Sequence, residues 1–416
     1  MRDLRVALLT REYPPDVYGG AGVHVEYLAR ELDRLVDLTV HCFGDDRPAG
    51  SRPRVVAHRP WAELAGDAPY RAALGAVSVD LAMAAAVEGS DLVHSHTWYA
   101  NFAGHLARLV HGIPHVATVH SLEPLRPWKA EQLGGGYAVS SWCERTALEA
   151  ADAVVAVSAE HRRDLLACYP AVDPERVSVI GNGIDTDEYR PDPGTDLVEA
   201  NGVDPGLPTV LFVGRVTRQK GLTHLLDAAV SIDPGAQIVL CAGAADTPEL
   251  AAEIEAKLER VRAARGRVVW IERMLARREV IQLLTHATVF VCPSIYEPLG
   301  IVNLEAMACE AAVVATDTGG IPEVVEDGVT GLLVPFEPSP DGSRAPVDPE
   351  RFAADIAERV NELVGDPAKA RRLGKAGRER AVERFDWRAI AEQTIALYRS
   401  LLDPVPAAAD SQAPAK

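Results

Sequence analysis

Short apolar runs alternate with longer amphipathic stretches along most of the chain. The first run, Leu4–Thr10, precedes a stretch from about Val23 to Leu35 in which apolar residues recur at helical spacing. Further strands are predicted at residues 38–43, 91–94, 115–120, 153–158 and 177–180, with a helix over 72–88. Strands that alternate with helices in this way indicate βαβ units and a parallel sheet.

The alternation is interrupted once and then restarts. Residues 191–208 are rich in Pro, Gly and Asp and show little periodicity, so we place a domain linker there. Strands are then predicted at residues 209–213, 238–242, 268–271, 288–292, 312–316 and 331–335. The pattern predicts an α/β protein with two Rossmann-like, doubly wound domains, 1–195 and 205–386. The last patterned helix is 387–402, and the Ala/Pro-rich tail 403–416 is predicted to be disordered.

Composition narrows the class of partner. The net charge is −18, which disfavours nucleic acid and anionic membranes because both reward a basic surface. We read no apolar run of membrane-spanning length and no signal-peptide core at the amino end. The six cysteines form no C-x-x-C pair, which favours reduced, buried thiols. We therefore expect a cytoplasmic protein with small-molecule substrates, and a homodimer is compatible with the sequence.

Two carboxylates follow the strand 288–292. Pro293, Pro298 and Gly300 mark a loop that holds Glu297, and a helical pattern that carries Glu305 comes next. Ligands bind at the carboxyl ends of strands in open α/β sheets, and the helix start at Gly300, Ile301 and Val302 offers free backbone N–H groups to an anion. Read alone, either glutamate is equally well an ordinary surface charge.

Other candidates also follow predicted strands. They are a glycine loop with Gly19, Gly20 and Gly22; His120; and the cations Arg215 and Lys220. In two facing domains these groups would open onto one cleft, and the cations suit a diphosphate. A bare glycine cluster is weak evidence, and His120 alone is also typical of a core histidine.

Some features stay open at this stage. Histidines 94, 96, 111 and 115 surround the same region, but they match no metal-binding spacing, so we predict no metal site. Asp185-Thr186-Asp187 is interpreted as turn chemistry, with a divalent ion as the minority reading. Trp98, Tyr99 and Trp128 are either core aromatics or sugar-stacking residues.

The combination resembles the fourth family of retaining glycosyltransferases over residues 4–402. Glu297 and Glu305 match its E-x7-E motif, and Gly214-Arg215 with Lys220-Gly221 matches its donor-diphosphate pair. The glycine loop and Thr118-Val119-His120 match its amino-terminal half. The runs 11–15 and 19–24 look like glycogen synthases. The run 120–129 looks like an actinobacterial branch that includes α-maltose-1-phosphate synthase.

The resemblance implies the GT-B fold, with an interdomain cleft and a final helix that crosses back to the first domain. It also implies retaining glucosyl transfer from ADP-glucose without a metal or other cofactor. His120, Glu297, Arg215 and Lys220 would be catalytic. Gly19, Gly20, Gly300, Ile301, Val302 and Glu305 would help to bind the donor. The family commonly has glycine where this chain has Glu310, so a positive φ there would be strained by ~1 kcal/mol.

The acceptor and the nucleobase remain open. A glucose-1-phosphate acceptor would use cations such as Arg11, Arg126, Lys129 and Arg145, whereas an α-1,4-glucan would use aromatics and hydroxyl groups. The run Leu125–Lys129 favours glucose-1-phosphate as the acceptor. A mannosyltransferase with a lipid or small-molecule acceptor and a non-catalytic sugar-binding protein are the alternatives. The acidic net charge weighs against the mannosyltransferase, and the lack of a signal-peptide core weighs against the sugar-binding protein.

Overall fold

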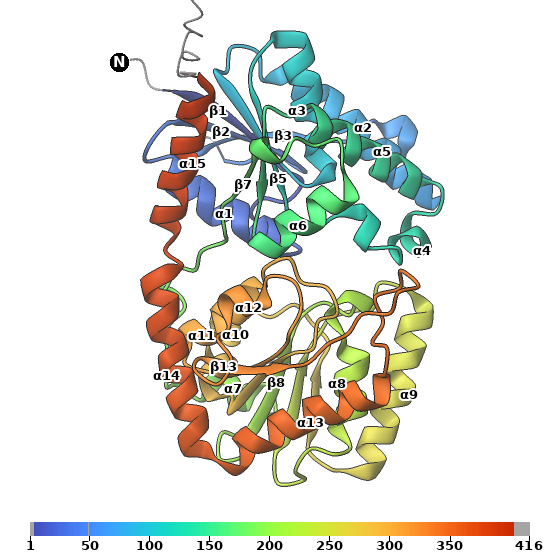
Figure 1. Cartoon of the computed structure of the whole chain (residues 1–416), viewed down its shortest axis with the longest axis vertical. Helices are drawn as coiled ribbons and strands as arrows, with labels where there is room; N and C mark the ends of the chain where they lie inside the picture. The colour runs from blue at the N-terminus through green and yellow to red at the C-terminus, as the bar shows by residue number, and fades with distance from the viewer. Residues whose placement is uncertain (1–3, 49, 403–416) are drawn as a thin grey trace, which may run out of the picture.

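Two parallel β-sheets lie one above the other (Figure 1) in the computed structural model, which describes residues 4–48 and 50–402. The tail 403–416, predicted to be disordered, lies outside the described residues. The first sheet has the order β3-β2-β1-β4-β5-β6-β7 and the second β10-β9-β8-β11-β12-β13. Strand order reverses beside β1 and β8, as in doubly wound folds. Ligand crevices form at such positions.

The strands are short and mostly buried on both faces, as expected for parallel sheets. The first sheet contains β1 (Arg5–Leu9), β2 (Asp37–Phe43), β3 (Arg54–His58), β4 (Leu92–His96), β5 (His115–Val119), β6 (Ala153–Ala156) and β7 (Val177–Val179). The second contains β8 (Thr209–Val213), β9 (Gln237–Cys241), β10 (Val268–Ile271), β11 (Val289–Cys292), β12 (Ala312–Thr316) and β13 (Gly331–Val334).

Helices cover both sheets. Those of the first half are α1 (Gly20–Leu32), α2 (Pro69–Ala86), α3 (Trp98–His111), α4 (Lys129–Leu133), α5 (Gly136–Ala150) and α6 (Ala159–Cys168). Those of the second are α7 (Asp196–Ala200), α8 (Leu222–Ala229), α9 (Pro248–Ala264), α10 (Arg277–His286), α11 (Ile301–Ala308), α12 (Ile321–Val324), α13 (Pro349–Gly365) and α14 (Pro367–Arg384). Helix α13 begins where sequence signals predict, because the Asp348 side chain caps it and Pro349 opens it.

The final helix, α15 (Trp387–Leu402), runs back along the first domain, in line with α14 (Figure 1). The ring of Trp387 stacks on that of Tyr27 in α1, with centroids 5.8 Å apart and planes 8° apart. Nδ1 of His94 in β4 lies 2.6 Å from the hydroxyl of Tyr398. The predicted return of the last helix is confirmed.

The structure differs from the local predictions at three places. Strand β3 was missed because its residues are only half-buried and the strand lies at the sheet edge. The stretch 191–208, where we place the domain linker, contains α7 and buries Val198 and Val203. The glycines expected to form a loop instead open α1, which begins at Gly20 with Gly19 as its cap.

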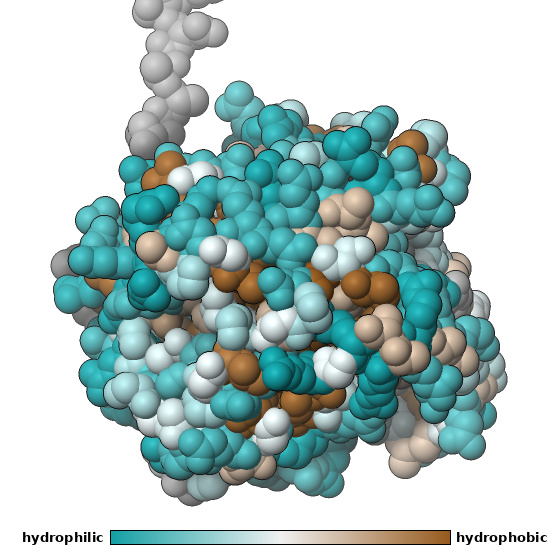
Figure 2. Space-filling model, turned by 90° about the horizontal axis from the view of Figure 1, so that it is seen from below, coloured by the Kyte–Doolittle hydropathy of each residue, from teal (hydrophilic) through white to brown (hydrophobic). Residues whose placement is uncertain are grey.

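The rest of the fold agrees with the composition. All six cysteines are free, and all but Cys168 are buried. In the described part of the chain, no helix is both long enough and apolar enough to cross a membrane. Seen from below, the surface is mainly hydrophilic, with hydrophobic residues in small groups (Figure 2).

Candidate functional site

The loop between β11 and α11 is fastened to its neighbours by backbone contacts. Gly221 has φ +65°, and a Cβ there would lie 1.9 Å from the carbonyl oxygen of Pro293. Gly319 has φ +55°, and its Cβ would lie 2.0 Å from the carbonyl oxygen of Glu297. Only glycine fits such positions, because an L side chain would meet both strain and collision. Neighbouring glycines therefore hold the position of Glu297.

The first domain contacts the same loop. The backbone N–H of Leu122 donates to the hydroxyl of Tyr296 at 3.2 Å. The hydroxyl of Ser158, the N-cap of α6, donates to the carbonyl of Pro298 at 2.6 Å. The loop that carries Glu297 therefore lies between the two domains.

Lys220 and Glu297 form an ion pair in this region. Nζ of Lys220 lies 2.6 Å from Oε2 of Glu297, and the hydroxyl of Ser294 donates to the same oxygen at 3.2 Å. Lys220 comes from the turn after β8, and the side chain of Thr217 caps that turn by accepting from the N–H of Lys220. Glu297 is only 7% exposed. The structure thus brings together two of the predicted catalytic residues.

Arg215 lies beside the predicted glycine segment. A Cβ on Gly19 would be 3.9 Å from Nε of Arg215, and one on Gly20 would be 3.8 Å from Cδ1 of Ile301. The guanidinium of Arg215 lies 5.1 Å from the centroid of the Tyr18 ring. Donor-binding candidates from the two halves of the sequence therefore meet at one place.

The segment before α1 already holds a carboxylate. Oε2 of Glu12 accepts hydrogen bonds from the backbone N–H groups of Gly19 and Tyr18 at 2.7 and 2.8 Å. The N–H of Gly19, one of the predicted donor-binding residues, is therefore engaged in this conformation. The sequence analysis named Glu12 only within the run 11–15 and did not predict this contact.

Helix α11 presents its amino end at the loop. Its N-cap is Gly300, with φ +94° and no side-chain capping hydrogen bond. Ile301 and Val302 are half-buried in the first turn, so their N–H groups are donors of the kind that bind anions. The structure therefore confirms the helix start expected at these residues, and anion binding there stays a prediction.

Glu305 lies on the second turn of α11, where Tyr189 is its hydrogen-bond partner. Burial raises the pKa of Glu305 to about 7, and the contact with Tyr189 opposes that rise. The carboxyl group is therefore poised to change charge near neutral pH. Tyr189 was not singled out from the sequence.

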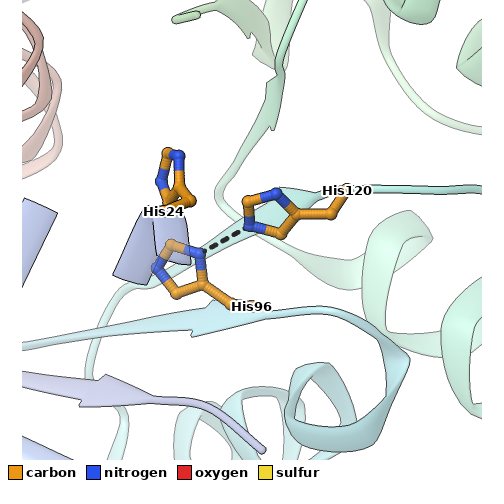
Figure 3. Close-up of side chains that lie close together, drawn as sticks. All are labelled: His24, His96 and His120. Atoms are coloured by element: carbon orange, nitrogen blue, oxygen red, sulfur yellow. Dashed lines mark hydrogen bonds between the residues drawn. The ribbon is translucent and has the colours of Figure 1, made fainter. Parts of the chain in front are cut away.

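His120 directly follows β5 and packs against two other histidines (Figure 3). Its Nε2 lies 3.0 Å from Nδ1 of His96, and its ring centroid lies 4.7 Å from that of His24. Burial and the neighbouring histidines lower the pKa of His120 well below its usual value. The imidazole is therefore neutral near pH 7 and able to serve as a hydrogen-bond partner or ligand.

The acceptor candidates divide into two groups. The guanidinium of Arg11 lies 4.1 Å from the Tyr99 ring centroid, and Nζ of Lys129 lies 5.3 Å from the same ring. Lys129 is only 5% exposed and lies 3.5 Å from Oε1 of Glu123, so part of its charge is already balanced. Arg126 donates to the hydroxyl of Ser121 at 3.1 Å. Arg145 is exposed on α5.

The structure also bears on the two questions left open by the sequence, the role of the aromatic residues and that of Asp185-Thr186-Asp187. Trp98 and Trp128 are buried, whereas Tyr99 is half-buried beneath Arg11. The side chain of Asp185 accepts from the N–H groups of Asp187 and Glu188 and from Arg30. That pattern is a turn joined to an ion pair, as the main interpretation predicted.

Glu323 makes a contact between domains that the sequence analysis missed. Its two carboxylate oxygens accept from the N–H groups of Ala159 and Glu160, each at 3.0 Å. These N–H groups open α6, so a residue of α12 caps a helix of the other domain. Such a contact favours the closed arrangement of the two domains.

Comparisons with known proteins agree with this geometry. Residues 18–188 match the model described as Glycosyltransferase Family 4, and residues 195–380 match the one described as Glycosyl transferases group 1. The chain is 55% identical to the α-maltose-1-phosphate synthase of Mycolicibacterium smegmatis, over 96% of this chain and 100% of that protein. The chain belongs to glycosyltransferase family 4.

More distant members of the family fit the same picture. A glycogen synthase of Mycobacterium tuberculosis is 28% identical over 95% of this chain and 94% of its own length. The structure of a sucrose-phosphate synthase from Thermosynechococcus elongatus aligns with a TM-score of 0.77 and 26% identity, covering 95% of this chain and 99% of that one. The family 4 glycosyltransferase therefore has the GT-B fold that its motifs implied.

Proposed function

We propose that this glycosyltransferase moves glucose from ADP-glucose to the 4-hydroxyl of an α-glucosyl acceptor, with retention at the anomeric carbon. The observation that carries the proposal is the pairing of Lys220 with Glu297 at 2.6 Å, beside Arg215 and the open amino end of α11. Cations and helix N–H groups suit a departing diphosphate, while a carboxylate within reach suits sugar hydroxyl groups.

Each domain has a part in this proposal. Residues 205–386 bind the nucleotide sugar, with Arg215, Lys220 and the amino end of α11 on the diphosphate, Glu297 on the sugar and Glu305 on the ribose. Residues 1–195, together with α15, bind the acceptor and supply His120 near the reacting carbon. The enzyme acts in the cytoplasm on small molecules or glucan.

Charge stabilisation is the main chemical task. When the bond between the anomeric carbon and the diphosphate breaks, negative charge grows on the leaving oxygen, and the fixed cations lower the energy of that charge. The leaving diphosphate accepts the proton of the acceptor hydroxyl on the same face, so no carboxylate nucleophile is needed. Lys220 has three N–H donors, which lets it keep Glu297 while it binds an oxygen of the diphosphate. We predict that the transfer needs no metal ion.

We further propose glucose-1-phosphate as the preferred acceptor, so that the product is α-maltose-1-phosphate. Support comes from Arg11, an exposed cation of the first domain whose guanidinium lies 4.1 Å from the centroid of the Tyr99 ring. The similarity to the M. smegmatis α-maltose-1-phosphate synthase supports the same acceptor. The second candidate is the non-reducing end of an α-1,4-glucan, which the 28% identity to a glycogen synthase of M. tuberculosis supports.

A donor and acceptor panel tests the proposal. ADP-, UDP- and GDP-glucose and GDP-mannose are each offered with glucose-1-phosphate, glycogen or no acceptor, and release of the nucleoside diphosphate is measured with and without a chelator. We expect the fastest release with ADP-glucose and glucose-1-phosphate, unchanged by the chelator, and an α-configured product by NMR.

Two variants sharpen the result. Glu297→Gln should abolish turnover of every donor, whereas Arg11→Ala should reduce the use of glucose-1-phosphate and spare glycogen. Preference for GDP-mannose, or equal rates of Arg11→Ala and the parent enzyme with glucose-1-phosphate, would rule out the corresponding part of the proposal.

A further inference from the structure

Three histidines from separate segments of the first domain converge on one point (Figure 3). His24 lies in α1, His96 ends β4, and His120 follows β5. One ring nitrogen of each lies within 4.8 Å of the corresponding atoms of the other two. Because His24 is far from the others in sequence, no spacing pattern could reveal the cluster.

A hydrogen bond to Asn182 fixes the orientation of the His24 ring. Its Nδ1 lies 2.7 Å from Oδ1 of Asn182, and an amide oxygen only accepts, so Nδ1 carries the proton. Its Nε2 then bears a lone pair, and this atom is buried without a hydrogen-bond partner. Histidines that bind metals are typically held in this way, with the other ring nitrogen donating to an oxygen.

The neighbouring His94 has no ring nitrogen left for a metal ion. Both of its ring nitrogens are occupied, by the hydroxyl of Tyr398 at 2.6 Å and by that of Thr118 at 2.7 Å. His96 and His120, by contrast, share a 3.0 Å contact with each other. That distance is close to the separation of two nitrogens on one tetrahedral ion, for which each bond is about 2.0–2.1 Å.

The rings of the cluster leave a lone pair free for a metal ion. Nε2 of His24 is buried without a hydrogen-bond partner, and a metal ion binds an imidazole through such a lone pair.

We propose that His24, His96 and His120 form a binding site for one divalent transition-metal ion of the zinc class. Three imidazoles and an open fourth position suit Zn²⁺ and its relatives, whereas Mg²⁺ and Ca²⁺ prefer oxygen ligands. The ion enters from the side of His120, which is half-buried, because His24 and His96 are 2% and 0% exposed.

The site has a consequence for catalysis that rests on the proposed function. An ion held by His120 removes this side chain from the donor sugar. The ion is therefore an inhibitor that competes with ADP-glucose and not a cofactor of the transfer. Donor and metal exclude each other, so saturating donor weakens apparent metal binding by mass action.

Cobalt serves as the probe, because Co²⁺ bound by nitrogen ligands in a tetrahedral site absorbs visible light. The full chain is stripped with a chelator and titrated with Co²⁺, and Zn²⁺ is then added to displace it. We expect one ion per chain, and loss of the visible band in His24→Asn and in His120→Asn. Circular dichroism establishes that each variant is folded, and His120, the most exposed of the three, tolerates replacement best.

Two comparisons make the test specific. His58→Asn is the matched control, because it breaks the His41–His58 pair, 3.1 Å apart, and leaves the cluster intact. Its cobalt band should equal that of the parent. Asn182→Ala should weaken binding about tenfold by freeing the His24 ring, while Asn182→Asp, which keeps an acceptor oxygen, should retain the binding.

The results separate this inference from the proposed function. Absence of the band in the parent chain, or an equal band in folded His24→Asn, would overturn the metal site. Failure to turn over ADP-glucose would overturn the proposed function and leave the cobalt result standing. A metal affinity unchanged by saturating ADP-glucose would overturn the competition between ion and donor.

Discussion

Nζ of Lys220 and Oε2 of Glu297 lie 2.6 Å apart, although the two residues follow different strands, β8 and β11. These strands are neighbours in the second sheet, so the pair lies where the carboxyl ends of adjacent strands meet. The ion pair holds a cation and an acid together at the place proposed for the diphosphate and the sugar. Removing either group changes how the other is held.

Replacing Lys220 tests the cation. Lys220→Ala should lower kcat with ADP-glucose roughly a hundredfold, because one fixed donor to the developing charge is lost. Calorimetry should also show weaker ADP binding. Lys257→Ala is the matched control, since Lys257 pairs with Asp227 on the same domain, away from the loop. Equal losses in the two variants would contradict the assignment.

The pH dependence of Glu305 gives a second prediction. Its folded pKa of about 7 is above the ordinary value of 4.5, so its contribution to stability is full below pH 4.5 and is lost as pH rises to about 7. The free energy of unfolding of the parent should therefore fall relative to Glu305→Gln by roughly 3 kcal/mol across this window. Denaturant unfolding of both proteins at pH 5 and pH 8 measures the difference, and parallel curves would contradict it.

The same carboxyl group predicts a pH effect on binding. If Glu305 accepts ribose hydroxyl groups as a carboxylate, ADP should bind more tightly as pH rises through about 7. The Gln variant should lack this step. Calorimetric titration of ADP from pH 6 to pH 8 makes the comparison, and a step of equal size in both proteins would assign it to another group.

We predict that Glu323 stabilises the closed arrangement of the two domains. Glu323→Ala removes the cap on α6, a contact of ~1 kcal/mol, so the donor affinity of the closed form should weaken about fivefold. Small-angle scattering should show a larger radius of gyration. Glu326→Ala is the control, because Glu326 pairs with Arg380 within the second domain. Scattering curves that coincide for Glu323→Ala and the parent would count against this role.

We predict that replacing Glu310 with glycine stabilises the protein. It has φ +64°, as its departure from the family pattern indicated, so Glu310→Gly should relieve ~1 kcal/mol and raise the Tm by roughly 3 °C. Glu310→Ala keeps the strained backbone and removes the 3.9 Å contact with Arg378, which separates the two effects. A glycine variant no more stable than the alanine variant would show that the strain is negligible.

The sequence predicted best where pattern and spacing were both strong. Strands β8, β10 and β12 and helix α15 have the bounds expected, because each is a clear apolar or amphipathic run. The relation of Glu297, Lys220 and Arg215 followed from the rule that sites form at carboxyl ends of strands. What failed were weak local signals, such as the edge strand β3 and the five-residue helix α7.

Contacts between distant segments were beyond sequence reasoning. Glu12 binds the N–H of Gly19, and Glu323 caps a helix of the other domain, and the sequence pattern predicted neither contact. The cluster of His24 with His96 and His120 depends on the packing of α1 against two strand ends. Lys129, expected to be an open cation, is buried beside Glu123, and only the fold places that acid next to it.

The path of α15 has a consequence for synthesis. Tyr27 and His94 are made early, but the side chains that cover them, Trp387 and Tyr398, are among the last described residues to leave the ribosome. Until α15 is made, the surface of α1 around Tyr27 that α15 covers is therefore exposed to water. A nascent chain arrested before residue 387 would be a target for chaperones, and release of the last helix would complete the half that was made first.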